Sequence, residues 1–230
     1  MASLYEFNNA TDCDDELARV LSKEMSTVLI NQPKINMAIA GGNTPKALYQ
    51  KLSHSHLPWE RVQITLTDER WVNVDHLDSN ENMARQKLLR NQAVGASFIG
   101  LKSNDENVQE AVLSCDENLK SHMKKLDLVI LGMGEDGHFA SIFPNLDNLD
   151  SLLDLKETLY CQAVFPKDKP ARMSLTMAYL LTARKIYLRI SGDVKKNIIL
   201  GILNNSFDKA YPIAELFKQS YSPIDIYWSL

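Results

Sequence analysis

The sequence predicts an α/β fold: a Rossmann-like, mostly parallel sheet with helices on both faces. Short apolar runs with strand character alternate with segments of helical periodicity along the chain. Such alternation is typical of βαβ units, which build parallel sheets covered by helices. Several apolar runs end in polar or glycine-containing loops, where open α/β sheets bind their ligands. No linker, internal repeat or low-complexity tract interrupts this pattern, so we expect a single domain over residues 1–230.

The predicted elements follow one another as this fold requires. Apolar residues recur at helical spacing from Leu17 to Leu29, after three acids that favour a helix N-terminus. Four further helices are expected near residues 46–52, 108–119, 192–203 and 213–218. Strands are expected at residues 35–40, 62–67, 126–131 and 185–191, with residues 224–228 as an edge strand.

Composition places the chain among ordinary globular proteins. Hydrophobic residues make up 45% of its 230 residues, which is enough for a sizeable core. No apolar run approaches the roughly 20 residues that span a bilayer, and no signal peptide pattern is present. Cys13, Cys115 and Cys161 are widely separated and fit neither a disulfide framework nor a zinc pattern. We therefore expect a cytoplasmic protein with reduced thiols and no membrane partner.

The net charge and the spacing of the histidines limit which ligands and partners we expect. The net charge is −4 and there is no basic block, so we expect no nucleic-acid partner. An anionic small molecule remains possible, because a few local lysines or arginines can hold it. His54 and His56 are spaced like metal ligands, but no acid or cysteine completes the set, so no metal is expected. The sequence leaves open whether the protein is a monomer or a homodimer.

The loop at residues 132–138, GMGEDGH, follows the most apolar predicted strand. It places His138 beside Asp136 and Glu135. An imidazole next to a carboxylate can transfer a proton near neutral pH. We therefore predict His138 as a general base that one of the two acids orients, and the sequence does not decide which.

The segment GGNTP, residues 41–45, joins a predicted strand to a predicted helix. Gly41 and Gly42 allow the backbone to approach a ligand closely. Thr44 suits the N-cap and the proline after it suits the first helical position. Together with Asn43, these residues predict an anion-binding turn, although a simple tight turn explains the pattern as well. The segment does not match the dinucleotide or P-loop fingerprints.

Cations follow three of the predicted strands or strand-like segments. Arg70 lies in DERW after the second strand, and its planar guanidinium can clamp an oxyanion or a phosphate. Asp68 can orient Arg70 or a substrate hydroxyl. Arg172 and Lys195 are each unremarkable alone, but a phosphate needs such partners. Because the carboxyl ends of parallel strands meet at one edge, we expect these loops to form one cleft.

Four segments in this order resemble the 6-phosphogluconolactonase family. They are AGGNTPKALYQKL, LTDERWVNVDHLDSNENMARQKLL, LDLVILGMGEDGHFASIFP and RMSLTMAYLLTARKIYLRISGDVKK, which together lie within residues 40–196. The resemblance implies a fold like that of glucosamine-6-phosphate deaminase, and hydrolysis of 6-phospho-D-glucono-1,5-lactone to 6-phospho-D-gluconate in the oxidative pentose phosphate pathway. It implies no cofactor and no metal. It assigns His138 as the base and Gly42, Asn43, Thr44, Arg70, Arg172 and Lys195 as substrate and phosphate contacts.

The chain departs from the family pattern at two positions. Asn43 stands where serine is usual, and Phe139 stands where threonine is frequent. Asparagine can still donate a hydrogen bond, whereas Phe139 removes a hydroxyl beside His138. The predicted mechanism is attack of water, activated by His138, on the lactone carbonyl, with Arg70 or loop N–H groups stabilising the oxyanion.

Two other functions compete with lactone hydrolysis. A sugar-phosphate isomerase or deaminase of the same fold carries a glutamate five residues after the histidine, where this chain has Phe143. A non-catalytic sugar-phosphate sensor would carry a basic helix-turn-helix at its N-terminus, and this chain begins with an acidic stretch. Both alternatives are therefore disfavoured, and the first is tested by release of ammonia from glucosamine 6-phosphate.

Overall fold

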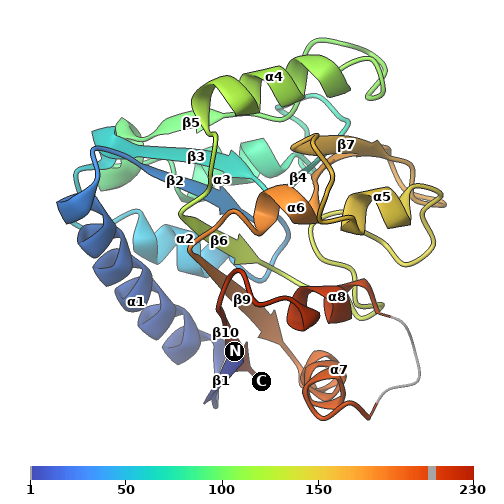
Figure 1. Cartoon of the computed structure of the whole chain (residues 1–230). Helices are drawn as coiled ribbons and strands as arrows, with labels where there is room; N and C mark the ends of the chain where they lie inside the picture. The colour runs from blue at the N-terminus through green and yellow to red at the C-terminus, as the bar shows by residue number, and fades with distance from the viewer. Residues whose placement is uncertain (1, 207–210) are drawn as a thin grey trace.

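The computed structural model of the chain describes residues 2–206 and 211–230. Its main sheet has seven strands in the order β1-β10-β9-β6-β2-β3-β5, and every paired register is parallel (Figure 1). This confirms the predicted α/β class. The strands are β1 (Ala2–Phe7), β2 (Ile35–Ile39), β3 (Val62–Leu66), β5 (Ser97–Ile99), β6 (Leu128–Leu131), β9 (Lys185–Ser191) and β10 (Ile224–Ser229).

Helices cover both faces of this sheet. Right-handed crossovers place α1, α2 and α3 on one face and the later helices on the other, and α2 contacts both α1 and α3. The helices are α1 (Ala10–Asn31), α2 (Lys46–Leu52), α3 (Asn80–Lys87), α4 (Val112–His122), α5 (Leu149–Leu153), α6 (Met177–Leu180), α7 (Asp193–Leu203) and α8 (Pro212–Lys218), with 3₁₀ turns at Trp59–Arg61 and Asn91–Gly95. None of the described helices is long and apolar enough to cross a membrane.

Three features of the sheets differ from the sequence prediction. The strand β10 is not at an edge, because β1 pairs with its outer side. The prediction missed β1 and β5, which are both only partly buried. It also missed a second, antiparallel sheet, in which DERW forms a strand rather than a loop. This sheet has the order β4-β8-β7, with β4 (Asp68–Arg70), β8 (Arg172–Leu175) and β7 (Cys161–Val164).

The neighbouring strands β2 and β6 form the switch point of the sheet, because the strands that follow them in sequence lie on opposite sides. From β2 the chain continues to β3 and β5 on one side, whereas β6 leads to β9 and β10 on the other. Neighbouring strands whose continuations leave in opposite directions open a crevice at their carboxyl ends, and open α/β sheets bind ligands there. The segments GGNTP and GMGEDGH follow these two strands, so the topology brings them together.

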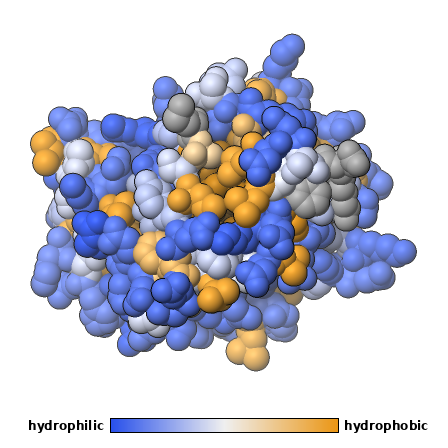
Figure 2. Space-filling view, turned by 90° about the horizontal axis from the view of Figure 1, so that it is seen from below, coloured by the Kyte–Doolittle hydropathy of each residue, from blue (hydrophilic) through white to orange (hydrophobic). Residues whose placement is uncertain are grey.

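The core fills the space between the sheet and both helical layers. All four residues of β6 are buried, as are most side chains of β2, β3 and β9. One charged pair lies inside it: the Arg189 Nε donates to the Asp14 Oδ1 at 2.7 Å and ties β9 to α1. The outer surface seen from below is mostly hydrophilic, with apolar side chains gathered near its centre (Figure 2). Cys13, Cys115 and Cys161 are buried and unpaired, as predicted.

Candidate active site

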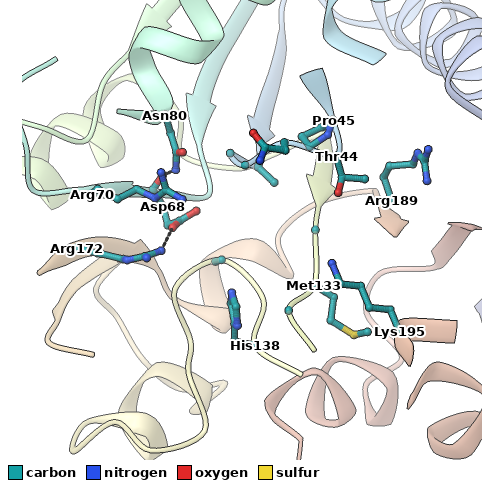
Figure 3. A pocket seen from close by; sticks show the side chains of 17 residues that line it. Thr44, Pro45, Asp68, Arg70, Asn80, Met133, His138, Arg172, Arg189 and Lys195 are labelled. Carbon is teal, nitrogen blue, oxygen red and sulfur yellow. Dashed lines mark hydrogen bonds and ion pairs between the residues drawn. The ribbon is translucent and has the colours of Figure 1, made fainter. Parts of the chain in front are cut away.

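A pocket of about 250 Å³ lies at the carboxyl ends of the parallel strands (Figure 3). It brings together GGNTP, GMGEDGH and the segments that carry Arg70, Arg172 and Lys195, which confirms the expectation that they form one cleft. Asp136 is the one predicted site residue that does not line it. The lining residues are Ala40, Gly41, Gly42, Asn43, Thr44, Pro45, Asp68, Arg70, Asn80, Gly132, Met133, Gly134, His138, Ala140, Arg172, Arg189 and Lys195.

His138 is oriented by Asp136. The His138 Nδ1 and the Asp136 Oδ1 lie 2.5 Å apart, and the His138 backbone N–H donates to the same oxygen. This contact leaves Nε2 as the ring nitrogen available to a ligand. Burial raises the pKa of Asp136, but the hydrogen bond from His138 and the charge of its imidazolium outweigh that and lower it to about 2. Glu135 is exposed, so the structure selects Asp136 between the two acids.

Glycines shape the loop around this pair. The His138 carbonyl accepts from the Gly134 N–H at 2.9 Å, and the Gly137 N–H donates to the Gly134 carbonyl, which closes a tight turn. A Cβ on Gly134 would lie 2.2 Å from the His138 ring, closer than side-chain carbons approach. Gly137 has a φ of +74°, a conformation that favours glycine. The loop therefore needs both glycines to hold the imidazole beside its carboxylate.

The chain turns sharply after the histidine. A bridge pairs Phe139 with Ile142, and Ala140 has a left-handed φ of +49°. Phe139 is fully buried in the core, so the residue that departs from the family pattern packs rather than facing a ligand. The turn brings Phe143 back under the imidazole, with ring centroids 4.2 Å apart and planes at 34°.

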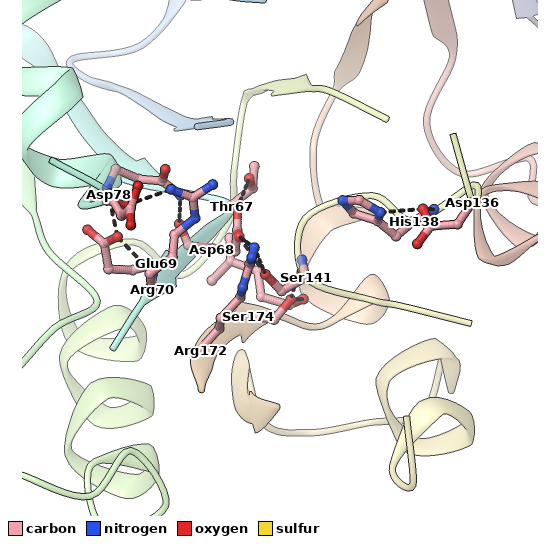
Figure 4. Close-up of polar contacts among 12 residues, drawn as sticks. Thr67, Asp68, Glu69, Arg70, Asp78, Asp136, His138, Ser141, Arg172 and Ser174 are labelled. Carbon is pink, nitrogen blue, oxygen red and sulfur yellow. Dashed lines mark hydrogen bonds and ion pairs between the residues drawn. The ribbon is translucent and has the colours of Figure 1, made fainter. Parts of the chain in front are cut away.

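The opposite side of the pocket is formed by Asp68, Arg70 and Arg172, which we call the arginine wall. Arg70 and Arg172 are direct cross-strand neighbours on β4 and β8. The Asp68 Oδ2 lies 3.5 Å from the Arg172 Nη1 and accepts a hydrogen bond from the Ser141 hydroxyl at 2.5 Å. Arg172 also donates to that hydroxyl at 3.3 Å (Figure 4). Asp68 thus fixes Arg172, whereas the sequence analysis assigned it to Arg70 or a substrate.

Arg70 is held by the backbone instead. Its Nη1 donates to the Asp78 carbonyl at 2.6 Å. Burial lowers the pKa of Arg172, although the Asp68 charge opposes that effect. The Nε atoms of Arg70 and Arg172 are both buried without a hydrogen-bond partner in the described part of the chain. Such unpaired donors cost free energy, which an anionic ligand would recover.

The GGNTP turn differs from its prediction in one detail. The sequence predicted Thr44 at the N-cap and Pro45 at the first helical position, but α2 begins at Lys46, with Pro45 at the N-cap position and no side-chain cap. Gly42 has a φ of +85°, as the tight turn requires. A Cβ on Gly41 would lie 1.9 Å from the Asn80 Oδ1, so this glycine allows close packing against α3. Thr44 therefore lines the pocket with its side chain free from capping.

Lys195 completes the pocket from α7, near the Met133 side (Figure 3). Burial lowers its pKa, and the charges of Glu135 and Asp136 oppose that shift. The sequence analysis did not identify Asn80, Met133 or Arg189 as lining residues. Arg189 had one available signal, a cation at an otherwise apolar position of a predicted strand.

Among the described residues, no group of three or more His, Cys, Asp or Glu side chains is arranged as metal ligands. The pocket's own side chains offer an oriented imidazole, that of His138, facing several fixed cations. Such a site can remove a proton from water and stabilise an anion that forms nearby.

Known proteins share both the sequence and the fold. A curated 6-phosphogluconolactonase of Caulobacter vibrioides is 34% identical, with 98% of this chain and 97% of the relative covered. That of Pseudomonas putida is 32% identical, with 98% and 92% covered. The crystal structure of a 6-phosphogluconolactonase from Shewanella baltica matches with a TM-score of 0.94 and 32% identity, covering 100% of this chain and 98% of that one.

The fold is also shared with a solved structure of much lower sequence identity. A monomeric glucosamine-6-phosphate deaminase matches with a TM-score of 0.74 at 16% identity, covering 99% of this chain and 97% of that one, which confirms the predicted fold relationship alone. The model of the glucosamine-6-phosphate isomerase/6-phosphogluconolactonase family matches residues 8–228. The chain therefore belongs to the glucosamine-6-phosphate isomerase/6-phosphogluconolactonase family.

Proposed function

We propose that the protein hydrolyses 6-phospho-D-glucono-1,5-lactone to 6-phospho-D-gluconate, a step of the oxidative pentose phosphate pathway. The observation that carries this proposal is His138, held by Asp136 at 2.5 Å and facing an arginine wall across one pocket. The full-length relatives named 6-phosphogluconolactonase support the substrate. An oriented base and fixed cations are what ester hydrolysis of an anionic lactone requires.

His138 begins the reaction as a neutral imidazole. Its Nε2 removes a proton from water while the water oxygen forms a bond to the lactone carbonyl carbon. The carbonyl π electrons move to the oxygen, and Arg70 or loop N–H groups stabilise the resulting oxyanion. Asp136 stabilises the imidazolium that forms at the same moment.

Collapse of this intermediate completes the hydrolysis. The oxyanion reforms the carbonyl, the bond from that carbon to the ring oxygen breaks, and His138 gives its proton to the departing ring oxygen. The products are a carboxylic acid, which ionises, and a free hydroxyl on the opened chain. His138 returns to its neutral form, so the residue acts first as base and then as acid.

Substrate binding uses the cations and the backbone around the pocket. Arg172 is prepared by Asp68 and Ser141, and the unpaired Nε atoms of Arg70 and Arg172 offer further donors. We propose that these arginines, Lys195 and the turn formed by Gly41, Gly42, Asn43 and Thr44 contact the substrate and its phosphate. Hydrogen bonds to charged groups are worth about 1.5–3 kcal/mol each, so a few suffice for micromolar to millimolar affinity.

The residue beneath the imidazole argues against the deaminase reaction. Ring opening and isomerisation need acid/base groups on both sides of the sugar. The position five residues after His138 holds Phe143, whose ring packs against the imidazole at an angle of 34° and has no proton to exchange. We expect no ammonia from glucosamine 6-phosphate. Measurable ammonia release would favour the deaminase instead.

The decisive experiment compares wild type with His138→Ala on freshly generated lactone, above its spontaneous hydrolysis. Loss of the general base should lower kcat by about 10²–10⁴-fold while the circular dichroism spectrum and Tm stay close to wild type. His122→Ala, which removes an exposed histidine on α4, is the matched control and should retain full turnover. Near-wild-type turnover by His138→Ala would contradict the proposal.

We also propose a single domain over residues 1–230, a cytoplasmic location, no nucleic-acid partner, and a monomer or homodimer. One hydrophobic core cluster extends from α1 to β10 in the described residues, which supports the single domain. The net charge of −4 supports the absence of a nucleic-acid partner. Light scattering decides the oligomeric state.

A further inference from the structure

Phe143 contacts both halves of the proposed catalytic apparatus. Its ring lies against the imidazole of His138, with centroids 4.2 Å apart. The guanidinium carbon of Arg172 lies 5.2 Å from the centroid of the same ring, and the Lys169 ammonium lies 4.5 Å from it. The base and a substrate-binding cation therefore share one aromatic support, although His138 lies in the loop after β6 and Arg172 lies on β8.

The local backbone is built to place this ring. The left-handed Ala140 and the bridge between Phe139 and Ile142 reverse the chain within a few residues. Phe143 then returns beneath the residue five positions earlier and is 6% exposed. A left-handed non-glycine residue is strained, so the surrounding packing must hold the turn in this shape.

The hydrogen bond to Asp136 does not by itself fix the imidazole. One contact at Nδ1 still allows the ring to rock about the bond that joins it to Cβ, which moves Nε2. The Phe143 ring, packed against the imidazole at an angle of 34°, limits this motion. The same ring limits Arg172 on β8 through a cation–π contact.

We propose that Phe143 is a positioning residue that sets the imidazole of His138 and the guanidinium of Arg172 in a fixed relative geometry. It acts on turnover through His138 and on substrate binding through Arg172, without touching the reacting atoms. This inference rests on the proposed lactonase function. It gives Phe143 a role in the hydrolysis itself, beyond the absence of the glutamate that a deaminase would need.

The first test compares Phe143→Leu with Phe139→Leu. Both replace a buried phenylalanine of the same turn, but the structure records a ring contact with His138 at Phe143 alone of the two. Phe143→Leu should lower kcat about tenfold, because a small misplacement of a base is costly, and raise KM about two- to fivefold. Phe139→Leu should lower Tm at least as much but keep kcat per folded molecule within about twofold. Phe143→Tyr, which keeps the ring, should restore most of the lost turnover.

The second test separates positioning from general packing. In the His138→Ala background, adding Phe143→Leu should change the residual turnover by less than about twofold, because the path through the imidazole is already absent. The rise in KM should persist, since Arg172 is still present. A further tenfold loss of turnover in the double variant would overturn the proposal and leave Phe143 a structural residue.

The third test needs no turnover. The ring current of the Phe143 phenyl group, 4.2 Å from the imidazole between centroids, shifts the NMR signals of the His138 ring protons upfield. Phe143→Leu should move these signals downfield, while Phe143→Tyr should leave them in place. Unchanged His138 signals in Phe143→Leu would refute the positioning role. If wild type fails to hydrolyse the lactone but the signals shift as expected, then the proposed function fails while the geometric inference stands.

Discussion

The two sides of the pocket are built in different ways. On one side, His138 is held by Asp136, two residues away in the sequence. On the other, the arginine wall depends on Ser141, which lies 73 residues from Asp68 and 31 from Arg172. The base is therefore positioned by a local loop, whereas the cations are positioned by tertiary structure.

The two sides of the pocket also differ in the solvent exposure of their side chains. The side chains of His138 and Asp136 are 25% and 40% exposed, but those of Arg172 and Asp68 are 11% and 7% exposed. A base that must exchange protons with water needs that access. Fixed cations gain from the opposite, because a charge interacts more strongly where water is excluded. The site thus combines a wet proton-transfer side with a drier, preorganised binding side.

Among the variants that test this difference, removal of the carboxylate beside His138 should have the largest effect on turnover. Asp136→Asn should lower kcat by about 100-fold and leave KM within about threefold, because an amide neither stabilises the imidazolium nor fixes the same tautomer. Steady-state kinetics on fresh lactone measures both constants. Glu135→Gln removes the exposed neighbouring acid and should retain at least half of the turnover. Equal losses in both variants would mean that the loop acts through its total charge rather than through one contact.

A conservative change in the arginine wall should act on binding instead. Arg172→Lys keeps the charge but loses the fork that reaches Asp68 and Ser141, so KM should rise about tenfold while kcat changes only a fewfold. Lys169→Gln removes a second cation from the Phe143 ring, outside the pocket lining, and should change KM by less than about threefold. If Arg172→Lys lowered kcat without changing KM, the proposal that the arginine wall acts on substrate binding rather than on turnover would be wrong.

The same division explains what the sequence could predict. The alternation of strand and helix patterns identified the fold class, and the strand-end loops identified the cleft, because both signals are local. The pair of His138 and an acid was equally predictable, since Asp136 lies only two positions before His138. Deciding between Asp136 and Glu135 required the backbone path through Gly134 and Gly137.

Structural features that depend on residues far apart in the sequence could not be predicted. The strands β4 and β8 are short, and their pairing follows from the tertiary position of two loops. The expectation that Asp68 orients Arg70 was wrong, because Arg70 is only two residues away in the sequence, whereas the ion pair is made with Arg172 on the neighbouring strand. The edge assignment of β10 failed for the same reason: its neighbour β1 lies at the other end of the chain.

The smallest predicted effect concerns stability in acid, where carboxylates on the two sides should respond with opposite signs. The pKa of Asp136 is lowered to about 2, so its stabilisation is present above about pH 4 and lost as pH falls toward 2. Burial raises the pKa of Glu69 on β4, despite four hydrogen bonds to its carboxylate. Its protonation stabilises the fold below about pH 4.5, and this contribution is lost as pH rises through the raised pKa.

Urea unfolding of wild type, Asp136→Asn and Glu69→Gln between about pH 3 and pH 5.5 measures both contributions. On lowering the pH, the stability advantage of wild type over Asp136→Asn should shrink by about 1 kcal/mol or less, because this half-exposed pair is screened by water. The advantage of wild type over Glu69→Gln should instead grow. Parallel curves for the two variants would show that the carboxylate of the histidine loop and the buried carboxylate on β4 do not differ electrostatically. Stability differences that change with pH in opposite directions would show that the solvent-accessible carboxylate of Asp136 is stabilised in its charged form, whereas the buried carboxyl of Glu69 is stabilised in its neutral form.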